Sequence, residues 1–241
     1  MPGWVHEIFA SIQGEGIYCG QAQTFVRLAG CNLACDYCDT SAAREPNPPA
    51  CLVELVPGSG SVVEIANPMA AEQVTGYCRE LARSVVSVTG GEPLVQADFL
   101  ERLLADLKSA GFVTHLETNG TLYRTLAGVV RLIDVIAMDM KLPSAAGSGE
   151  LWGEHSRFIE IASGTEVFVK AVVSADTTED EIRRCADTIA SVDRRIPLVI
   201  QPVTGPETPS GELLMRLQDA ACANIADARV IPQCHKALGL R

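Results

Sequence analysis

The stretch that decides the fold is Cys31-Asn32-Leu33-Ala34-Cys35-Asp36-Tyr37-Cys38, in which three cysteines fall within eight residues. Thiolates at this density bind an iron-sulfur cluster or a zinc ion. Three cysteine ligands would leave one iron of a four-iron cluster free to bind a small molecule. A structural zinc ion would need a fourth protein ligand, and the sequence offers several candidates. These candidates are His6, His115, His155, His235, Cys19 and Cys51.

The rest of the chain alternates apolar runs with segments of helical periodicity. One predicted strand, 24–28, leads directly into the cysteines, and further strands are predicted at 85–88, 112–116, 133–138, 167–173, 198–200 and 229–231. Helices are predicted near 70–83, 98–111, 122–132, 178–192 and 211–221. Strands that alternate with helices pair in parallel. About six strands after the cysteines are too few for a closed eight-stranded barrel, so we predict an α/β fold with an incomplete (β/α)6-type partial barrel.

Residues 41–68 interrupt this alternation with five prolines and two glycines. Proline and glycine disfavour a crossover helix, so we expect a loop-rich insertion with a short hairpin. No composition shift marks a second core. We therefore expect one domain over residues 1–241.

Polar residues follow the predicted strands where each one ends. They are Thr89-Gly90-Gly91-Glu92-Pro93, Glu117-Thr118-Asn119-Gly120, Asp139-Met140-Lys141 and Gln201-Pro202. Because parallel strands end at the same edge of a sheet, these groups and the cysteine loop are expected to share one site.

The composition narrows the classes of partner. A net charge of −11 opposes binding to a nucleic acid, so a small-molecule substrate is favoured. The chain has no long apolar stretch and no signal peptide at its start, which predicts a cytoplasmic protein without a membrane partner. Nine cysteines, an odd number, also favour a reducing compartment over a disulfide framework.

Cys31-x3-Cys35-x2-Cys38, with Tyr37 before the last cysteine, resembles the signature of the radical S-adenosylmethionine (SAM) superfamily. Gly90-Gly91-Glu92-Pro93 after a strand resembles that superfamily's second motif. The resemblance implies a 4Fe-4S cluster on the three cysteines and SAM on the open iron. It also implies reductive cleavage of SAM to a 5′-deoxyadenosyl radical, which removes a hydrogen atom from the substrate.

Arg27 lies four residues before Cys31, in the alternation phase of Phe25 and Ala29. If that face points inward, the guanidinium needs an anionic partner, either a substrate carboxylate or an internal carboxylate. The combination of Arg27 with Gln13-Gly14-Glu15-Gly16 and Asp39-Thr40 is similar to the pattern of the 7-carboxy-7-deazaguanine synthase family. The similarity extends to the terminal Pro232-Gln233-Cys234-His235-Lys236. It implies conversion of 6-carboxy-5,6,7,8-tetrahydropterin to 7-carboxy-7-deazaguanine with loss of ammonia, in queuosine and related 7-deazapurine biosynthesis.

The resemblance also implies roles for single residues, with the radical supplied by the cofactor and no catalytic side chain. Those expected to contact SAM are Tyr37, Cys38, Asp39, Gly91, Glu92, Asp139, Met140, Lys141, Ile200, Gln201, Pro202 and Val203. Those expected to contact the substrate are Ile12, Gln13, Gly14, Glu15, Arg27, Thr89, Glu117 and His235. Thr40 is expected to bind Mg²⁺. A flavodoxin- or ferredoxin-type protein is expected to supply electrons. The enzyme is expected to be either a monomer or a homodimer.

Two other interpretations stay open at this point. A glycyl-radical enzyme activating protein shares the short cysteine spacing but acts on a partner polypeptide. A zinc-stabilised binding module, from a different class, would use the cysteines without iron.

Overall fold

Ten strands form one mixed sheet in residues 1–147 and 149–240, the part of the chain that the computed structural model describes. Their order across the sheet is β10-β9-β8-β7-β6-β5-β2-β1-β3-β4. From β2 to β10 all neighbouring strands are parallel, while β1 is antiparallel to β2. The strands are β1 (Val5–Ile12), β2 (Ala22–Leu28), β3 (Ala50–Val53), β4 (Val63–Ala66), β5 (Val85–Gly90), β6 (Val113–Thr118), β7 (Val135–Asp139), β8 (Glu166–Val173), β9 (Leu198–Pro202) and β10 (Ala228–Val230).

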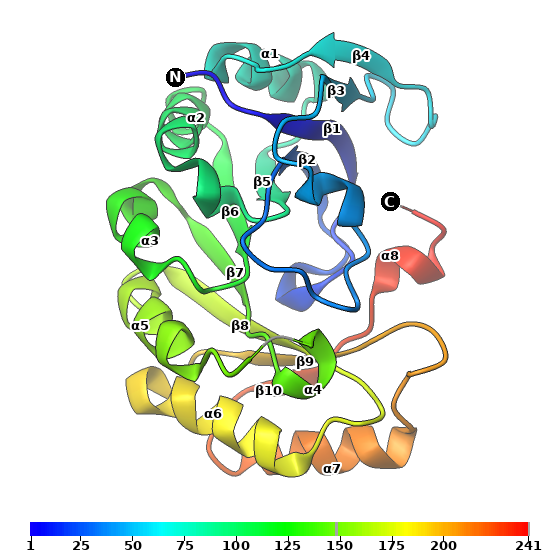
Figure 1. Ribbon diagram of the computed structural model, residues 1–241, viewed down its shortest axis with the longest axis vertical. Coiled ribbons are helices and arrows are strands. Elements are labelled where there is room, and N and C mark those ends of the chain that lie inside the picture. Colours follow the sequence, from blue (N-terminus) through cyan, green and yellow to red (C-terminus); the bar gives the residue numbers. More distant parts are fainter. Residues whose placement is uncertain (148, 241) are drawn as a thin grey trace.

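The longer helices cover the outer face of the curved sheet, whereas the cysteine loop and the short C-terminal helix lie on the other side (Figure 1). The helices are α1 (Ala71–Leu81), α2 (Ala97–Ser109), α3 (Tyr123–Val129), α4 (Pro143–Ala146), α5 (Trp152–Ala162), α6 (Glu179–Asp193), α7 (Gly211–Cys222) and α8 (Cys234–Ala237). Short 3-10 turns are η1 (Gly16–Tyr18), η2 (Ser41–Arg44), η3 (Pro93–Gln96) and η4 (Val130–Leu132). This arrangement is the predicted partial barrel, with its inner face free for a site.

Apolar periodicity explains how the helices attach to the sheet. In α2 the five residues predicted to share one face, Phe99, Leu100, Leu103, Leu104 and Leu107, are all buried. Each such side chain contributes about 2 kcal/mol of hydrophobic stabilisation. The helix starts after Gln96, so Asp98 lies in its first turn and does not cap it. There the Asp98 carboxylate still interacts favourably with the helix dipole.

The proline-rich insertion extends the sheet at one edge. Strands β3 and β4 form an antiparallel hairpin, as expected, and β3 pairs with β1 in parallel. Glu54, only 2% exposed, accepts hydrogen bonds from Gly60 N at 2.7 Å and from Ser59 Oγ at 3.5 Å. The Glu54 carboxylate therefore fixes the loop of the hairpin.

Two of the longer elements, β1 and α5, were not predicted, and neither were the four-residue helices α4 and α8. Strand β1 has only weak alternation, because Ile8, Phe9 and Ala10 are all buried in succession. Helix α5 carries Gly153 near its start and polar residues between its apolar ones. Both elements depend on tertiary packing, which local pattern does not reveal.

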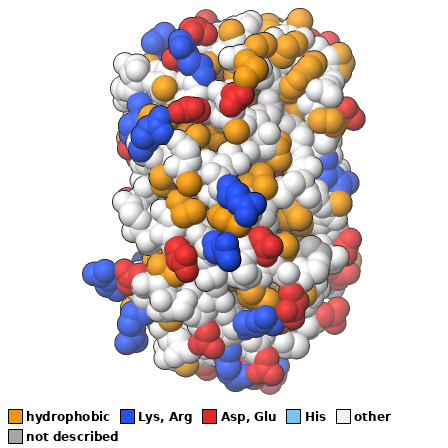
Figure 2. Space-filling view, turned by 60° about the vertical axis from the view of Figure 1, so that its left-hand side comes forward, with side chains coloured by type: hydrophobic (Ala, Val, Ile, Leu, Met, Phe, Trp, Pro, Cys, Tyr) orange, Lys and Arg blue, Asp and Glu red, His pale blue; other side chains and the backbone are white. Residues whose placement is uncertain are grey.

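The outer, helix-covered side carries acidic and basic side chains interspersed with one another (Figure 2). None of the helices in the described part of the chain is both long enough and apolar enough to cross a membrane.

Candidate active site

A cavity of about 720 Å³ opens on the inner face of the sheet. Its walls come from the carboxyl ends of the parallel strands, as the polar strand ends predicted. A volume of this order holds one or two small organic molecules. Among the residues that line it are these predicted site residues: Ile12, Gln13, Gly14, Glu15, Arg27, Cys31, Cys35, Tyr37, Cys38, Asp39, Thr40, Thr89, Gly91, Glu117, Asp139, Lys141, Gln201, Val203 and His235.

The cysteine loop forms one wall of this cavity, and its three thiols are partly exposed. Burial raises the pKa of the Cys31 and Cys35 thiols, so a bound metal would have to displace their protons. In tetrahedral zinc sites the ligand atoms are about 4 Å apart, given zinc-sulfur bonds of about 2.3 Å. Among the described residues, only Glu15, Asp39 and His235 bring three potential ligand atoms within 4.8 Å of one another. The three cysteine sulfurs are therefore not all as close to one another as ligands of a single zinc ion would be.

The segment that follows β5, beginning with Gly91, packs directly against the start of the cysteine loop. Gly91 N donates to Leu28 O at 3.2 Å, and Glu92 N donates to Gly30 O at 2.8 Å. A β-carbon at Gly91 would lie 2.3 Å from Gly30 O and 2.9 Å from the Cys31 β-carbon. The two sequence motifs are therefore in direct contact, and only glycine fits between them.

Glu92 is fully buried beneath this contact. Its carboxylate accepts hydrogen bonds from Asn119 N at 2.7 Å, Thr118 Oγ1 at 2.8 Å and Leu94 N at 3.0 Å. Burial raises the pKa of Glu92 to about 6, despite these donors. Asn119 Nδ2 in turn donates to Asn32 Oδ1 at 2.9 Å, which ties the cysteine loop to the end of β6.

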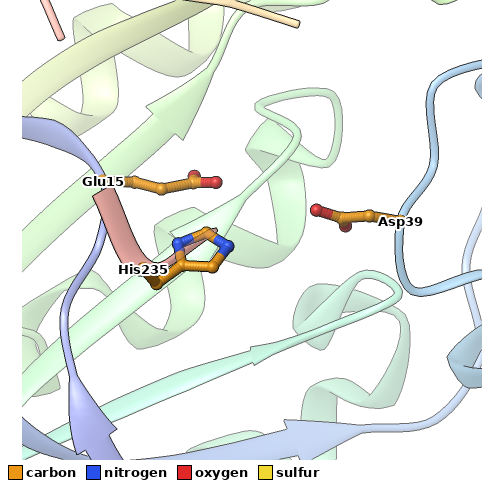
Figure 3. A group of neighbouring side chains, drawn as sticks. All are labelled: Glu15, Asp39 and His235. Carbon is orange, nitrogen blue, oxygen red and sulfur yellow. The ribbon is translucent and has the colours of Figure 1, made fainter. Parts of the chain in front are cut away.

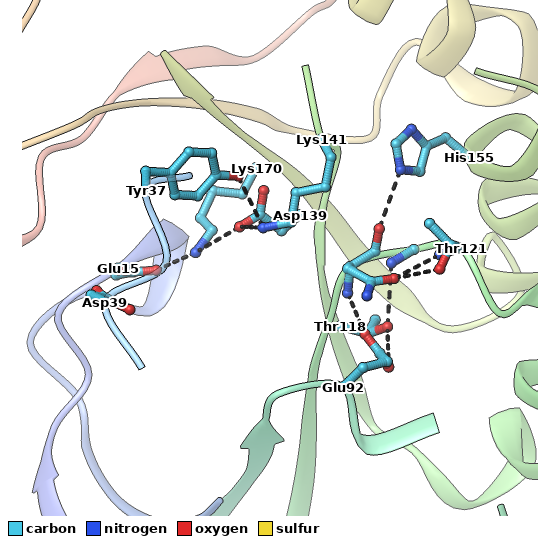
Figure 4. Close-up of polar contacts among 12 residues, drawn as sticks. Glu15, Tyr37, Asp39, Glu92, Thr118, Thr121, Asp139, Lys141, His155 and Lys170 are labelled. Atoms are coloured by element: carbon cyan, nitrogen blue, oxygen red, sulfur yellow. Dashed lines mark hydrogen bonds and ion pairs between the residues drawn. The ribbon is translucent and has the colours of Figure 1, made fainter. Parts of the chain in front are cut away.

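A chain of charged groups crosses the cavity between Glu15 and Tyr37 (Figure 4). Lys170 forms an ion pair with Glu15 and another, at 3.6 Å, with Asp139. Lys141 Nζ lies 2.9 Å from Asp139 Oδ2 and donates to Tyr37 Oη at 3.0 Å.

Burial alone would raise the pKa of Glu15, but the Lys170 ammonium lowers it to about 2. Burial would lower the pKa of Lys141, whereas Asp139 raises it well above its usual value. Both groups are therefore charged at neutral pH.

Two buried acceptor atoms in the cavity wall have no hydrogen-bond partner within the part of the chain that the structure describes. They are Asp139 Oδ1 and Gln201 Oε1. An unpaired buried acceptor costs free energy until a donor reaches it. Ribose hydroxyls and an adenine amino group are such donors, so these atoms and the cysteine thiols fit a cluster with bound SAM.

The opposite wall combines aromatic and polar groups. Phe9 and Phe25 stack with their ring centroids 5.2 Å apart. Gln13 Nε2 donates to Glu117 Oε1 at 2.8 Å. Arg27 Nε donates to Glu7 Oε1 at 2.7 Å, and both side chains line the cavity. This wall therefore offers a flat aromatic surface beside one guanidinium, one amide and two carboxylates.

The end of the chain folds back over the segment 13–15. Cys234 N donates to Gly14 O at 2.8 Å, and a β-carbon at Gly14 would lie 2.2 Å from His235 Nδ1. His235 then faces Glu15 and Asp39 (Figure 3). Gln233 Nε2 donates to Glu15 Oε1 at 2.7 Å and to Asp39 Oδ2 at 3.2 Å. Thr40, next to Asp39, also lines the cavity.

Some site residues are placed differently from what the sequence suggested. Four residues predicted to contact SAM are buried away from the cavity lining, namely Glu92, Met140, Ile200 and Pro202. Conversely, Lys170 and Gln233 line the cavity and join its walls, although no site role was predicted for them. A lone charge within the apolar run 167–173 predicts that Lys170 points into the barrel and forms a structural ion pair with Glu117 or Asp139. The pair with Asp139 is confirmed, at 3.6 Å.

The fold and its cysteine loop define a radical SAM protein. Residues 26–145 match the family model of the radical SAM superfamily. The chain resembles the solved structure of QueE from Escherichia coli, with a TM-score of 0.66 and 21% identity over 98% of this chain and 95% of that one. It also resembles Streptococcus suis SuiB, with a TM-score of 0.55 and 16% identity over 83% of this chain and 45% of that one. At these identities the likeness concerns the fold alone.

Sequence relatives identify the particular family. A 7-carboxy-7-deazaguanine synthase from Geobacter sulfurreducens is 39% identical over 98% of this chain and 96% of its own length. One from Methanopyrus kandleri is 37% identical over 96% of this chain and 92% of its own length. This chain belongs to the 7-carboxy-7-deazaguanine synthase family, and it is a radical SAM enzyme of deazapurine biosynthesis. These matches do not support a glycyl-radical enzyme activating protein or a zinc-stabilised binding module.

Proposed function

We propose that this enzyme converts 6-carboxy-5,6,7,8-tetrahydropterin to 7-carboxy-7-deazaguanine with loss of ammonia. The observation that carries the proposal is a single cavity with one wall of cysteine thiols and an opposite wall of charged and amide side chains. Cys31 and its neighbours form one wall, while Arg27, Gln13 and Glu117 form the other. The names of the relatives at 37–39% identity support the same reaction.

Cys31, Cys35 and Cys38 would hold the 4Fe-4S cluster, and Asp139 and Gln201 would accept hydrogen bonds from SAM. When bound, the cluster and SAM supply a 5′-deoxyadenosyl radical that removes hydrogen from C6 of the substrate. The chain itself supplies position and shielding. The enclosing strand ends and the tail at 232–240 keep bulk water from the reacting atoms.

Arg27 would bind the substrate carboxylate through the part of its guanidinium that faces the cavity. Its bond to Glu7 holds the side chain in one orientation. Gln13 and Glu117 offer an amide and a carboxylate to the polar edge of the pterin. A charge-assisted bond to a fixed guanidinium selects a substrate that has a carboxylate.

Mg²⁺ would bind beside Thr40, where its hydroxyl and substrate oxygens supply ligands. Mg²⁺ prefers oxygen ligands and retains waters, so few protein ligands are required. The neighbouring carboxylates of Asp39 and Glu15 increase the negative charge there. Lys170 and Lys236 already pair with these carboxylates, which favours a role in charge balance over direct coordination.

The physiological partner would be a flavodoxin- or ferredoxin-type protein that delivers single electrons. The odd number of cysteines in the sequence favours a reducing compartment such as the cytoplasm. A homodimer is the proposed assembly.

An anaerobic activity assay tests this function. The reconstituted enzyme, with SAM, dithionite, Mg²⁺ and the carboxytetrahydropterin, should form 7-carboxy-7-deazaguanine and one ammonia per product, measured by mass spectrometry. The triple variant Cys31→Ala/Cys35→Ala/Cys38→Ala should form none, and Cys222→Ala, at an exposed cysteine, should retain full activity. Absence of the deazaguanine with a fully loaded cluster would overturn the proposal.

A further inference from the structure

Lys170 is the one residue of the charged chain that contacts both walls of the cavity. It lies in β8 and is 14% exposed through its side chain. Its ammonium pairs with Glu15, which is 155 positions away in sequence, and with Asp139 at 3.6 Å. Asp139 and Lys170 are also register partners in the parallel pair β7·β8. The strand register therefore fixes the position of the ammonium.

Each carboxylate belongs to a different binding region. Glu15 N donates to Gln13 Oε1 at 3.1 Å, so Glu15 is part of the segment proposed for the pterin. Asp139 pairs with Lys141, which donates to Tyr37 in the cysteine loop. The Lys170 ammonium is thus shared between the pterin side and the SAM side.

We propose that Lys170 is a positioning residue that couples binding of the pterin to binding of SAM in this cavity; this inference rests on the proposed function. A ligand that reorients Glu15 weakens or strengthens the ion pair between Glu15 and Lys170. The Lys170 ammonium then shifts relative to Asp139, which changes the position of the Asp139 carboxylate. Coupling of two binding sites is reciprocal, so SAM must strengthen pterin binding by the same factor. The Lys170 ammonium can transmit this change between the two carboxylates because its side chain is largely buried and little water screens its charge.

Equilibrium binding of SAM to the cluster-loaded enzyme tests the coupling. Without reductant no cleavage occurs, so the Kd of SAM can be measured anaerobically with and without carboxytetrahydropterin. The wild-type enzyme should bind SAM about 5-fold or more tightly when the pterin is present. In Lys170→Met this ratio should fall to about one, and Lys170→Arg, which keeps the charge, should restore most of it.

Two further variants separate positioning from folding. Lys108→Met removes an ion pair with Asp134 on the outer side, 2.6 Å long, and should leave the ratio unchanged. Lys170→Met alone leaves the Glu15 carboxylate buried without its cation and can therefore fail to load its cluster. In that case the double variant Glu15→Gln/Lys170→Met is used, because it removes both charges together. In this double variant the ratio should also be about one.

A wild-type ratio of one, or an unchanged ratio in the loaded Lys170→Met or double variant, would overturn the inference. These outcomes differ from failure of the proposed function, which is read from the wild-type product alone. An enzyme that forms the deazaguanine but binds SAM independently of the pterin disproves only the coupling.

Discussion

Arg27 and Glu7 face each other across the antiparallel pair β1·β2, with Nε and Oε1 2.7 Å apart. The sequence left two partners open for Arg27, an internal carboxylate or a substrate carboxylate. The structure shows the internal partner, and it also places Arg27 in the cavity wall. The bond to Glu7 thus fixes the orientation of the Arg27 guanidinium while leaving it in the cavity lining.

Arg27→Ala should lower kcat/KM for the carboxytetrahydropterin by about 10- to 100-fold, because one charge-assisted contact to the carboxylate is lost. Uncoupled SAM cleavage should persist, since the guanidinium of Arg27 bonds to Glu7 and is proposed to hold the pterin carboxylate, not SAM. Both rates can be measured in one anaerobic assay by quantifying the deazaguanine and 5′-deoxyadenosine. Loss of both activities together would instead mean that Arg27 supports the cluster or the fold.

Gly91→Ala should reduce cluster occupancy, because the new methyl group would lie 2.3 Å from the Gly30 carbonyl oxygen. The contact is with backbone, which cannot rotate away as a side chain can. Iron and sulfide per chain, with the absorption spectrum, measure the loss. Gly76→Ala in α1 is the matched control, since no atom lies within 4 Å of its added methyl group. That variant should be about 0.5–1 kcal/mol more stable and fully loaded.

Asn119→Ala should make the cluster more labile, because Asn32 loses its 2.9 Å bond to the end of β6. We expect faster iron loss to a chelator, with little change in the secondary structure measured by circular dichroism. Asn224→Ala, an exposed position whose amide bonds to Asp187, is the control. Equal rates of iron loss in all three proteins would show that the cysteine loop does not depend on Asn119.

His155 should make stability pH-dependent in a definite direction. Burial lowers the pKa of His155 to about 4 from 6.5, and its Nε2 donates to Asn119 O at 3.2 Å. As the pH falls from 6.5 to 4, the unfolded chain takes up a proton that the folded chain does not. The free energy of unfolding should therefore fall by about 3 kcal/mol over this window. Urea titrations of the wild type and His155→Gln measure the difference, and parallel pH profiles would contradict the expectation.

The predictable parts of this molecule are those that local pattern determines. The five apolar positions of α2 and the continuous runs of β5 and β9 identify their elements directly, and the polar strand ends indicate where the cavity lies. The pairing of Lys170 with Glu15 could not be predicted, because it joins positions 155 residues apart. The buried position of Glu92 was also missed, since a family motif does not distinguish a ligand contact from a residue that holds the motif in shape.

The most direct test of the account follows the substrate hydrogen itself. Carboxytetrahydropterin deuterated at C6 should pass its deuterium to the 5′ carbon of 5′-deoxyadenosine or of recovered SAM, as mass spectrometry of a single anaerobic turnover would show. That result requires the pterin and SAM to share the cavity between Arg27 and Cys31. Deuterium found only in the deazaguanine or in the solvent would contradict the account.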